Sequence, residues 1–356
     1  MTRIPPREAS RARGGRKLRA RRLLPAGCAL LLCTLAPAPA PAGTVTFQSE
    51  NDLYGDGEDR WYTNGARLVV TWRARDRATP WPNRASDALL RLSLGLDRAD
   101  LAAEPHAHRH LFALGQNMYT PRTIKVASPL FGDRPYAGWL YLEAGSTALA
   151  GDRRDEWLIS AGVVGPAALA RQTQTAVHEL VDSPRPLGWA NQLPNSPALQ
   201  LAYRQSRYLT LAGDPEGAAL QLAPFAGAEI GTVSLAADAG VVLRGGWRIG
   251  RRLPARIGPM IVGSPFVPEA DRRASFEVFA GLGGRLVGWN RLLQGPFLRD
   301  APVTVPVQRA LFELTIGGRL SWRHVALTYG YTLRGKEFRG QSEGQAFGHA
   351  GLSISF

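Results

Sequence analysis

Long segments in which apolar and polar residues alternate constrain the fold of this sequence more than any other feature. From Phe312 to Trp322 the even-numbered positions are apolar apart from one glycine, and the odd-numbered positions are polar or small. The same pattern returns over 325–334 and 350–356. Period-two alternation gives a β-strand one apolar face and one polar face. Such strands fit either a soluble sandwich or a membrane barrel whose apolar face meets lipid.

Three features favour the barrel. The alternating segments run to about 10 residues or more, whereas strands of soluble sheets average about 5–6. Their polar faces carry charges in mid-strand, such as Glu313, Arg319 and Arg334, which suit a wet interior, and aromatic residues gather near the strand ends. The sequence also ends on a strand, with Phe356 in phase with the apolar face, an ending that resembles the assembly signal of bacterial outer-membrane barrels.

The pattern therefore predicts an all-β fold, a transmembrane antiparallel β-barrel of about twelve strands, an even number as bacterial barrels have. Segment 86–97 could extend a neighbouring strand or form its own, which would change the count by up to two. No run after residue 42 approaches the roughly 18 apolar residues of a membrane helix. The predicted strands are 44–51, 62–73, 109–120, 136–148, 156–164, 197–209, 218–230, 232–244, 274–288, 308–322, 323–335 and 345–356.

One stretch interrupts the strands. Pro166 precedes residues 167–181, which contain neither glycine nor proline, and Pro184 and Pro186 follow them. Proline suits the first turn of a helix and the segment beyond its end, but not its middle. We therefore expect one short helix of about 15 residues inserted in a loop.

The first 42 residues have the organisation of a secretory signal peptide. Nine basic residues and one acidic residue precede an apolar core over 23–35, and small residues of the A-x-A type end the segment at Ala42. Removing 1–42 lowers the net charge from +14 to +6 and removes both cysteines, which excludes disulfides and thiolate metal sites. We expect one barrel domain over 43–356. The remaining charge is spread along this domain, so we expect no nucleic-acid partner.

Candidate reactive residues lie around the helix and the first hairpin. Gln174 and His178 are four residues apart and share one helix face. If the alternation holds, Thr63 and Asp52 point into the barrel and Tyr62 points outward. A carboxylate, a hydroxyl and a histidine are thus expected to converge at one barrel mouth.

Seven short motifs, in this order, make the chain resemble the lipid A 3′-O-deacylase family of bacterial outer-membrane barrels. The resemblance is strongest over 45–205 and weaker toward the C-terminus. The motifs are Asn51-Asp52, Tyr62-Thr63-Asn64-Gly65, the segments 115–121 and 133–139, Gly162 to Pro166, Gln174 with His178, and 189–193.

The resemblance implies an outer-membrane esterase that binds Ca²⁺ and hydrolyses an acyl ester of lipid A in lipopolysaccharide. His178 would be the base that activates water, and Gln174 would assist it from one turn earlier. Asp52 would bind the ion, while Asn51 and Thr63 would complete the polar cluster. Histidine titrates near neutral pH and Ca²⁺ prefers oxygen ligands, so the implied chemistry is coherent.

Two departures from the family pattern affect the substrate more than the fold. The basic residues that follow the Tyr-Thr-Pro turn have only approximate counterparts in Arg122 and Lys125, to which we add Arg134 as a further substrate-binding candidate. An acidic residue is expected shortly after the histidine, but Pro184 stands there. A phospholipid esterase on the same scaffold therefore stays an alternative, as does a non-enzymatic barrel that serves as a pore or a structural protein; we expect a monomer.

Each candidate also has an ordinary structural explanation. Asp52 beside Asn51 is compatible with a simple turn, and Thr63 with an ordinary strand residue. A second group, His106, His108 and His110, would share one face of a strand and could bind a transition metal, or it could lie in a solvated loop.

Overall fold

The computed structural model describes residues 43–55, 57, 59–74, 80–94, 108–257, 261–266 and 273–356. All of them belong to one compact unit. The predicted signal peptide, residues 1–42, lies outside the described residues, as does His106.

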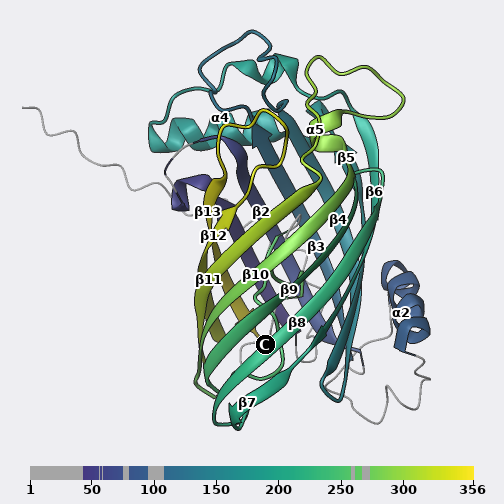
Figure 1. The fold of residues 1–356 in the computed structure, drawn as a ribbon, viewed down its shortest axis with the longest axis vertical. Helices are drawn as coiled ribbons and strands as arrows, with labels where there is room; N and C mark the ends of the chain where they lie inside the picture. The colour runs from purple at the N-terminus through teal and green to yellow at the C-terminus, as the bar shows by residue number, and fades with distance from the viewer. Residues whose placement is uncertain are drawn as a thin grey trace, which may run out of the picture. The chain divides into compact units, whose positions relative to one another are not determined.

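The described residues form a closed antiparallel barrel of twelve long strands, which confirms the predicted fold class (Figure 1). Each strand pairs with the next along the chain, β1 pairs with β13, and β6 pairs with β8. The short β7, Leu209–Gly213, only extends the β8 edge. The long strands are β1 Gly43–Asn51, β2 Trp61–Arg73, β3 His108–Thr120, β4 Ala137–Ala150, β5 Arg153–Val164, β6 Ser196–Arg207, β8 Ala218–Gly231, β9 Ser234–Trp247, β10 Ser275–Asn290, β11 Ala310–Trp322, β12 Val325–Arg334 and β13 Gln345–Ser355.

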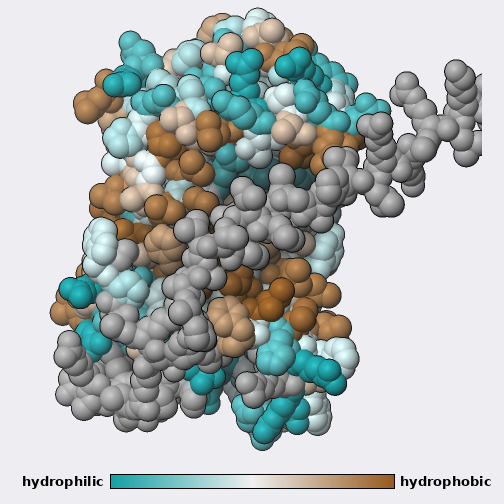
Figure 2. Space-filling view, turned by 180° about the vertical axis from the view of Figure 1, so that it is seen from behind, coloured by the Kyte–Doolittle hydropathy of each residue, from teal (hydrophilic) through white to brown (hydrophobic). Residues whose placement is uncertain are grey.

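The sequence alternation becomes the two faces of the barrel wall. Phe312, Leu314 and Ile316 of β11 are exposed on the outside, while Glu313 and Thr315 between them are buried in the lumen. Hydrophobic side chains accordingly gather on the visible face of the wall between more hydrophilic ends (Figure 2). None of the described helices is long and apolar enough to cross a membrane.

The helices lie outside the strand pattern. The expected helix is present as a 3-10 turn, Pro166–Ala168, followed by α4, Ala170–Val181. The structure adds α2, Trp81–Leu94, and the single turn α5, Arg291–Gln294. Segment 86–97, considered above as a possible strand, is helical up to Leu94.

The lumen is filled by ion pairs and by part of the β9–β10 connection. Arg256 in that connection places Nε 2.5 Å from Oε1 of Glu50 on β1, and its Nη1 lies 3.4 Å from Glu313 on β11. Arg67 of β2 donates to the carbonyl of Pro265 in the same connection. A cavity of about 100 Å³ remains beside this segment, which is room for a few water molecules only.

A β-bulge corrects the expected directions of Tyr62 and Thr63. The pairing of β2 with β3 shifts by one residue between Tyr62 and Asn64, and such a slip reverses the faces of the side chains beyond it. The Tyr62 hydroxyl therefore donates to Glu50 in the lumen, whereas the Thr63 hydroxyl contacts that of Thr120. Thr120 is in phase with Leu114, which is exposed on the outer face.

Two helices cover the outer face of β3 and β4 at opposite ends. α4 lies at the end where β3 finishes, and α2 contacts β3, β4 and β5 near the end where β3 begins (Figure 1). Both chain ends of the barrel, Gly43 and Phe356, are joined by hydrogen bonds at the α2 end. We call these the α4 end and the α2 end.

Candidate active site

Helix α4 sits on the outer face of the barrel wall because small residues let it approach closely. Gly138 on β4 faces Ala170, and a Cβ built on this glycine would lie 2.5 Å from the Ala170 side chain. Beside this contact, Ala170 packs with Met118 of β3 and Trp189 in one buried cluster. The candidate side chains of α4 are therefore held against the outer wall at the α4 end, and not inside the barrel mouth as the alternation predicted.

His178 is buried between two oxygen atoms. Its Nδ1 lies 2.6 Å from the carbonyl oxygen of Pro184, and its Nε2 lies 2.9 Å from Oδ2 of Asp59. A carbonyl oxygen can only accept a hydrogen bond, so Nδ1 carries a proton. Pro184, which stands where an acidic residue was expected, thus contacts the histidine through its backbone, and the side of the ring bearing Nε2 faces Asp59.

Asp59 is the site residue that the sequence did not reveal. Its carboxylate accepts hydrogen bonds from the Gln174 amide at 3.1 and 3.2 Å and also contacts Thr63. Burial raises the pKa of Asp59 above its ordinary value, and the nearby His178 only partly offsets this effect. Asp59 lies in the loop before β2, in an acid-rich stretch where no residue pattern distinguishes it from its neighbours.

Gln174 is fixed in orientation by a tryptophan. The indole Nε1 of Trp189 donates to Oε1 of Gln174 at 2.7 Å, so the amide nitrogen must face Asp59. The structure therefore brings together three of the predicted residues, His178, Gln174 and Thr63, around an aspartate that was not predicted.

Asn51 and Asp52 shape the loop that presents Asp59. The Asn51 side chain accepts from the Leu53 backbone and caps the 3-10 turn Asp52–Tyr54. The Asp52 carboxylate is fully buried and accepts the backbone N–H groups of Leu53 at 2.9 Å and Arg60 at 2.7 Å. These contacts hold both ends of the 52–60 loop, and the metal-binding role of Asp52 stays a prediction.

The predicted substrate-binding residues differ in accessibility. Arg122 and Lys125 are exposed in the loop that follows β3. Arg134 is buried; its Nη1 lies 2.9 Å from Glu337 and its guanidinium stacks over Tyr119. The first two can meet an anionic ligand without rearrangement, whereas Arg134 already holds the loop to the barrel.

The surface beside the cluster is apolar. Leu169, Val177, Leu180 and Val181 of the α4 region are exposed, and so is Leu187 in the following loop. Exposed apolar groups gathered in this way mark a surface that meets a membrane or another apolar partner. The His178–Asp59 pair thus lies next to an exposed apolar surface that is suited to lipid.

The solved structure of LpxR from Salmonella typhimurium is similar to this chain at 19% sequence identity with a TM-score of 0.70, covering 88% of this chain and 100% of that one. The translocator domain of autotransporter NalP from Neisseria meningitidis matches at 10% identity and a TM-score of 0.34, covering 92% and 93% of the two chains. The beta domain of the Bordetella autotransporter BrkA matches at 9% and 0.38, covering 89% and 99%.

None of the curated proteins compared with the sequence matches it. The family model described as outer membrane protein LpxR, in contrast, matches residues 23–356, nearly the whole sequence. The chain therefore belongs to the LpxR family of outer-membrane proteins.

Proposed function

We propose that this protein is an outer-membrane esterase that removes the 3′-O-linked acyl chain of lipid A, with His178 as the base that activates water. Membership of the LpxR family supports a general role as an outer-membrane lipid A deacylase. The proposal adds the bond that is cleaved, the residues that cleave it and the ion that assists them.

The contacts of His178 support its role as the base. Its Nδ1 proton is held by the Pro184 carbonyl, so the second nitrogen, Nε2, is the one that exchanges a proton. Nε2 and the Asp59 carboxylate lie within hydrogen-bond distance, so a proton carried by either group can bridge them. With that proton released, Nε2 accepts one from a water molecule as the water attacks the ester carbonyl.

Asp59 and Gln174 support the same step. The ionised Asp59 carboxylate stabilises the imidazolium that forms when His178 takes up the proton. Gln174, itself fixed by Trp189, keeps the carboxylate directed at the ring through two amide contacts. His178 then returns the proton to the alkoxide of the departing sugar, which leaves lipid A with a free hydroxyl and releases a fatty acid.

The donor chemistry of the cluster fits a calcium ion. Ca²⁺ prefers carboxylate and other oxygen ligands, and Asp59 and Thr63 bring such oxygens together beside His178. We assign the ion to these two residues and keep Asp52, in the same loop, as a further candidate ligand. When bound, Ca²⁺ polarises the ester carbonyl and offsets the negative charge that develops on its oxygen.

The position of the cluster on the outer face of the wall is the observation that carries the proposal. An acyl chain in the membrane reaches this face directly, along the exposed Val177, Leu180 and Val181, without entering the lumen. The exposed Arg122 and Lys125 lie in the neighbouring loop, where they can meet the lipid A phosphates. In the part of the chain that the structure describes, ion pairs and the β9–β10 connection occupy the lumen, which does not support the pore alternative.

Mass spectrometry of lipid A tests the proposal. The purified protein is incubated with lipid A in detergent micelles, with Ca²⁺ or with a chelator. We expect a mass loss equal to the 3′ acyl chain with its secondary chain in the presence of Ca²⁺, and no loss with chelator. Phospholipid in a parallel reaction is expected to stay intact; its hydrolysis in place of lipid A would overturn the substrate.

Histidine variants test the mechanism in the same assay. His178→Ala is expected to lower the rate about 10²–10⁴-fold, the usual contribution of a general base. His324→Ala is the matched control because His324 is exposed at the α2 end, where its Nδ1 lies 3.0 Å from the Ser355 carbonyl oxygen. A rate that His178→Ala leaves equal to that of the control contradicts the assigned base.

A further inference from the structure

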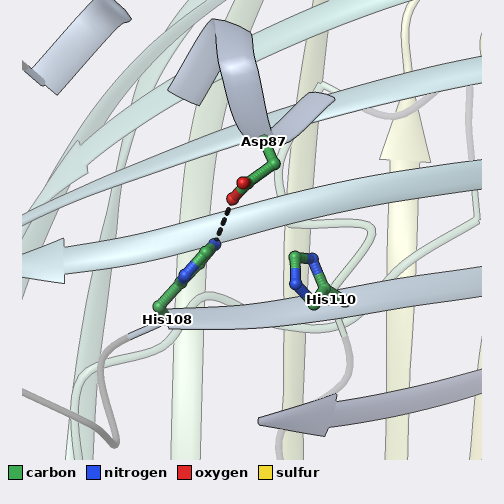
Figure 3. Close-up of side chains that lie close together, drawn as sticks. All are labelled: Asp87, His108 and His110. Carbon is green, nitrogen blue, oxygen red and sulfur yellow. Dashed lines mark ion pairs between the residues drawn. The ribbon is translucent and has the colours of Figure 1, made fainter. Parts of the chain in front are cut away.

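A second histidine cluster lies at the α2 end of the barrel and plays no part in the proposed reaction. His108 and His110 stand at the start of β3 on its outer face, in phase with the exposed Phe112 and Leu114. Asp87 of α2 points down at them, and the three side chains converge (Figure 3). The structure thus supplies the partner, Asp87, that the histidine pattern alone did not identify.

The cluster is buried although it consists of polar groups. The exposed fractions are 7% for Asp87, 4% for His108 and 0% for His110. One ligand-type atom from each residue lies within 4.8 Å of the other two, and His108 Nε2 is 2.8 Å from Oδ1 of Asp87. Burying polar groups is costly unless they are paired. The contacts that attach α2 to the wall therefore bear on why these three residues are buried.

Several polar contacts attach helix α2 to the wall. The Asn83 amide donates to the carbonyls of Leu111 and Gly145, and Ser86 contacts Ser146. In the apolar cluster beneath this helix, Leu90 packs with Ala148 and Trp157. Each hydrogen bond contributes little net stability because it replaces a hydrogen bond to water, so a metal crosslink between α2 and β3 would strengthen this attachment considerably.

The neighbours of the three residues restrain them as outer-shell groups restrain metal ligands. Arg91, one turn along α2, places Nε 3.0 Å from the second carboxylate oxygen of Asp87. The Ser146 hydroxyl lies 3.0 Å from Nδ1 of His110. Both contacts limit rotation of the side chains that would bind an ion.

The donor set selects the type of metal. Two imidazoles and one carboxylate suit zinc and related transition metals, whereas Ca²⁺ takes oxygen ligands. Zinc–nitrogen distances of about 2.0–2.1 Å in a tetrahedral site place ligand atoms about 3.3 Å apart. Small side-chain rotations from the present separations of 4.8 Å or less would reach that geometry.

We propose that Asp87, His108 and His110 bind one Zn²⁺ ion that fastens α2 to the outer wall of the barrel. The ion lies between the His108 ring and the Asp87 carboxylate. Figure 3 shows these two side chains as an ion pair. Water completes the fourth position, as in zinc sites with three protein ligands. The site is independent of the His178 cluster, which lies at the other end of β3.

Metal binding to the folded full-length protein tests the proposal. The protein in detergent micelles is stripped with chelator, equilibrated with Zn²⁺ and freed of excess ion, and zinc is measured per chain. We expect one equivalent in the wild type and in the His178→Ala and His324→Ala variants, and none in His110→Ala. Zinc content that stays unchanged in His110→Ala, or a wild type that retains no zinc, overturns the proposal.

Further variants guard against loss of folding. Asp87→Asn changes a residue of α2 outside the sheet, so it tests the ligand without altering the barrel wall, and it too is expected to lose the zinc. Each variant is accepted only if it shows the gel migration of a folded barrel. Co²⁺ bound in place of zinc is expected to show the strong visible absorption of a tetrahedral site in the wild type, and its absence there also contradicts the assignment.

Discussion

Strand β3 connects two clusters that contain the same pair of side chains. At the α4 end, Nε2 of His178 lies 2.9 Å from Asp59; at the α2 end, Nε2 of His108 lies 2.8 Å from Asp87. Both pairs lie against the outer face of the wall, and each joins a helix to a segment near it in space. Only their neighbours differ.

The neighbours determine the chemistry of each pair. Burial tends to raise the pKa of both carboxyl groups. At Asp59 this effect prevails over His178, so the pKa is raised; at Asp87 the contacts with His108 and Arg91 prevail, so the pKa is lowered. A carboxyl that holds a proton more readily suits proton exchange with the adjacent histidine. The two pairs therefore differ in how readily the carboxyl holds a proton.

Replacing each carboxylate by an amide gives the largest expected contrast. Asp59→Asn removes the charge that stabilises the His178 imidazolium, so lipid A hydrolysis is expected to fall about 10²-fold or more, with zinc content unchanged. Asp87→Asn is expected to have the reverse effect: no bound zinc and full hydrolysis. The mass-spectrometric assay and the zinc measurement check both. If either variant migrates as a folded barrel but loses both zinc and lipid A hydrolysis, the two clusters do not have separate roles.

Changing the residues that orient each cluster should give intermediate effects. Ser146→Ala removes the hydroxyl beside His110 and is expected to weaken zinc binding about 10- to 100-fold, as loss of an outer-shell partner typically does. Trp189→Phe leaves Gln174 without its indole donor and is expected to reduce hydrolysis about tenfold, equivalent to about 1.4 kcal/mol. Competition with a zinc indicator measures the first and initial rates the second. Full binding by Ser146→Ala would show that this hydroxyl does not orient the ligand.

The opposite pKa shifts predict opposite dependences of stability on pH. Above its ordinary pKa of 3.8, Asp59 keeps in the folded state a proton that the unfolded state has lost, so stability falls as pH rises through its raised pKa. Below 3.8, Asp87 has already released a proton that the unfolded state holds, so stability rises with pH up to that value.

Asp59→Asn should therefore remove a contribution to the free energy of unfolding that falls as the pH rises. Asp87→Asn should remove a contribution that increases with pH. Each contribution is about 1.4 kcal/mol for each unit of pKa shift. Urea unfolding in micelles between pH 3 and 7, followed by tryptophan fluorescence with chelator present, measures both. If both variants change the slope of unfolding free energy against pH in the same direction relative to the wild type, the opposite pKa shifts are contradicted.

The smallest effect is expected at Pro184. The contact with His178 uses its backbone carbonyl, so Pro184→Ala should keep hydrolysis within about threefold of the wild type, less than 1 kcal/mol of barrier. Initial rates on lipid A check this. A loss as large as that of His178→Ala would mean that the proline ring itself sets the geometry of the loop.

Most of the barrel follows from the sequence because its strands obey one simple rule. A lipid-facing strand must be apolar at every second position, so β11, β12 and β13 could be placed to within about three residues by alternation alone. Helix α4 was found from its flanking prolines. Its contacts bring His178, Gln174 and Thr63 together on the outer face of the wall, and their roles in catalysis stay a prediction.

The remaining features escape such rules for physical reasons. Helix α2 buries three polar residues, Asn83, Ser86 and Asp87, together with Leu90, so its buried face does not stand out as apolar in the sequence. Asp59 acts from a loop, where position in space does not follow from position in sequence. The bulge at Thr63 moves the phase of alternation by one residue, and no residue pattern marked it.

The ion pairs around Arg256 have a consequence for the passage of solutes as well as for the fold. An outer-membrane barrel with an open lumen, as in porins, lets water and small solutes through. Here Arg256, Glu50 and Glu313 hold the β9–β10 connection across the centre of the barrel. These ion pairs therefore keep the described part of the connection in the path that a solute would take through the barrel.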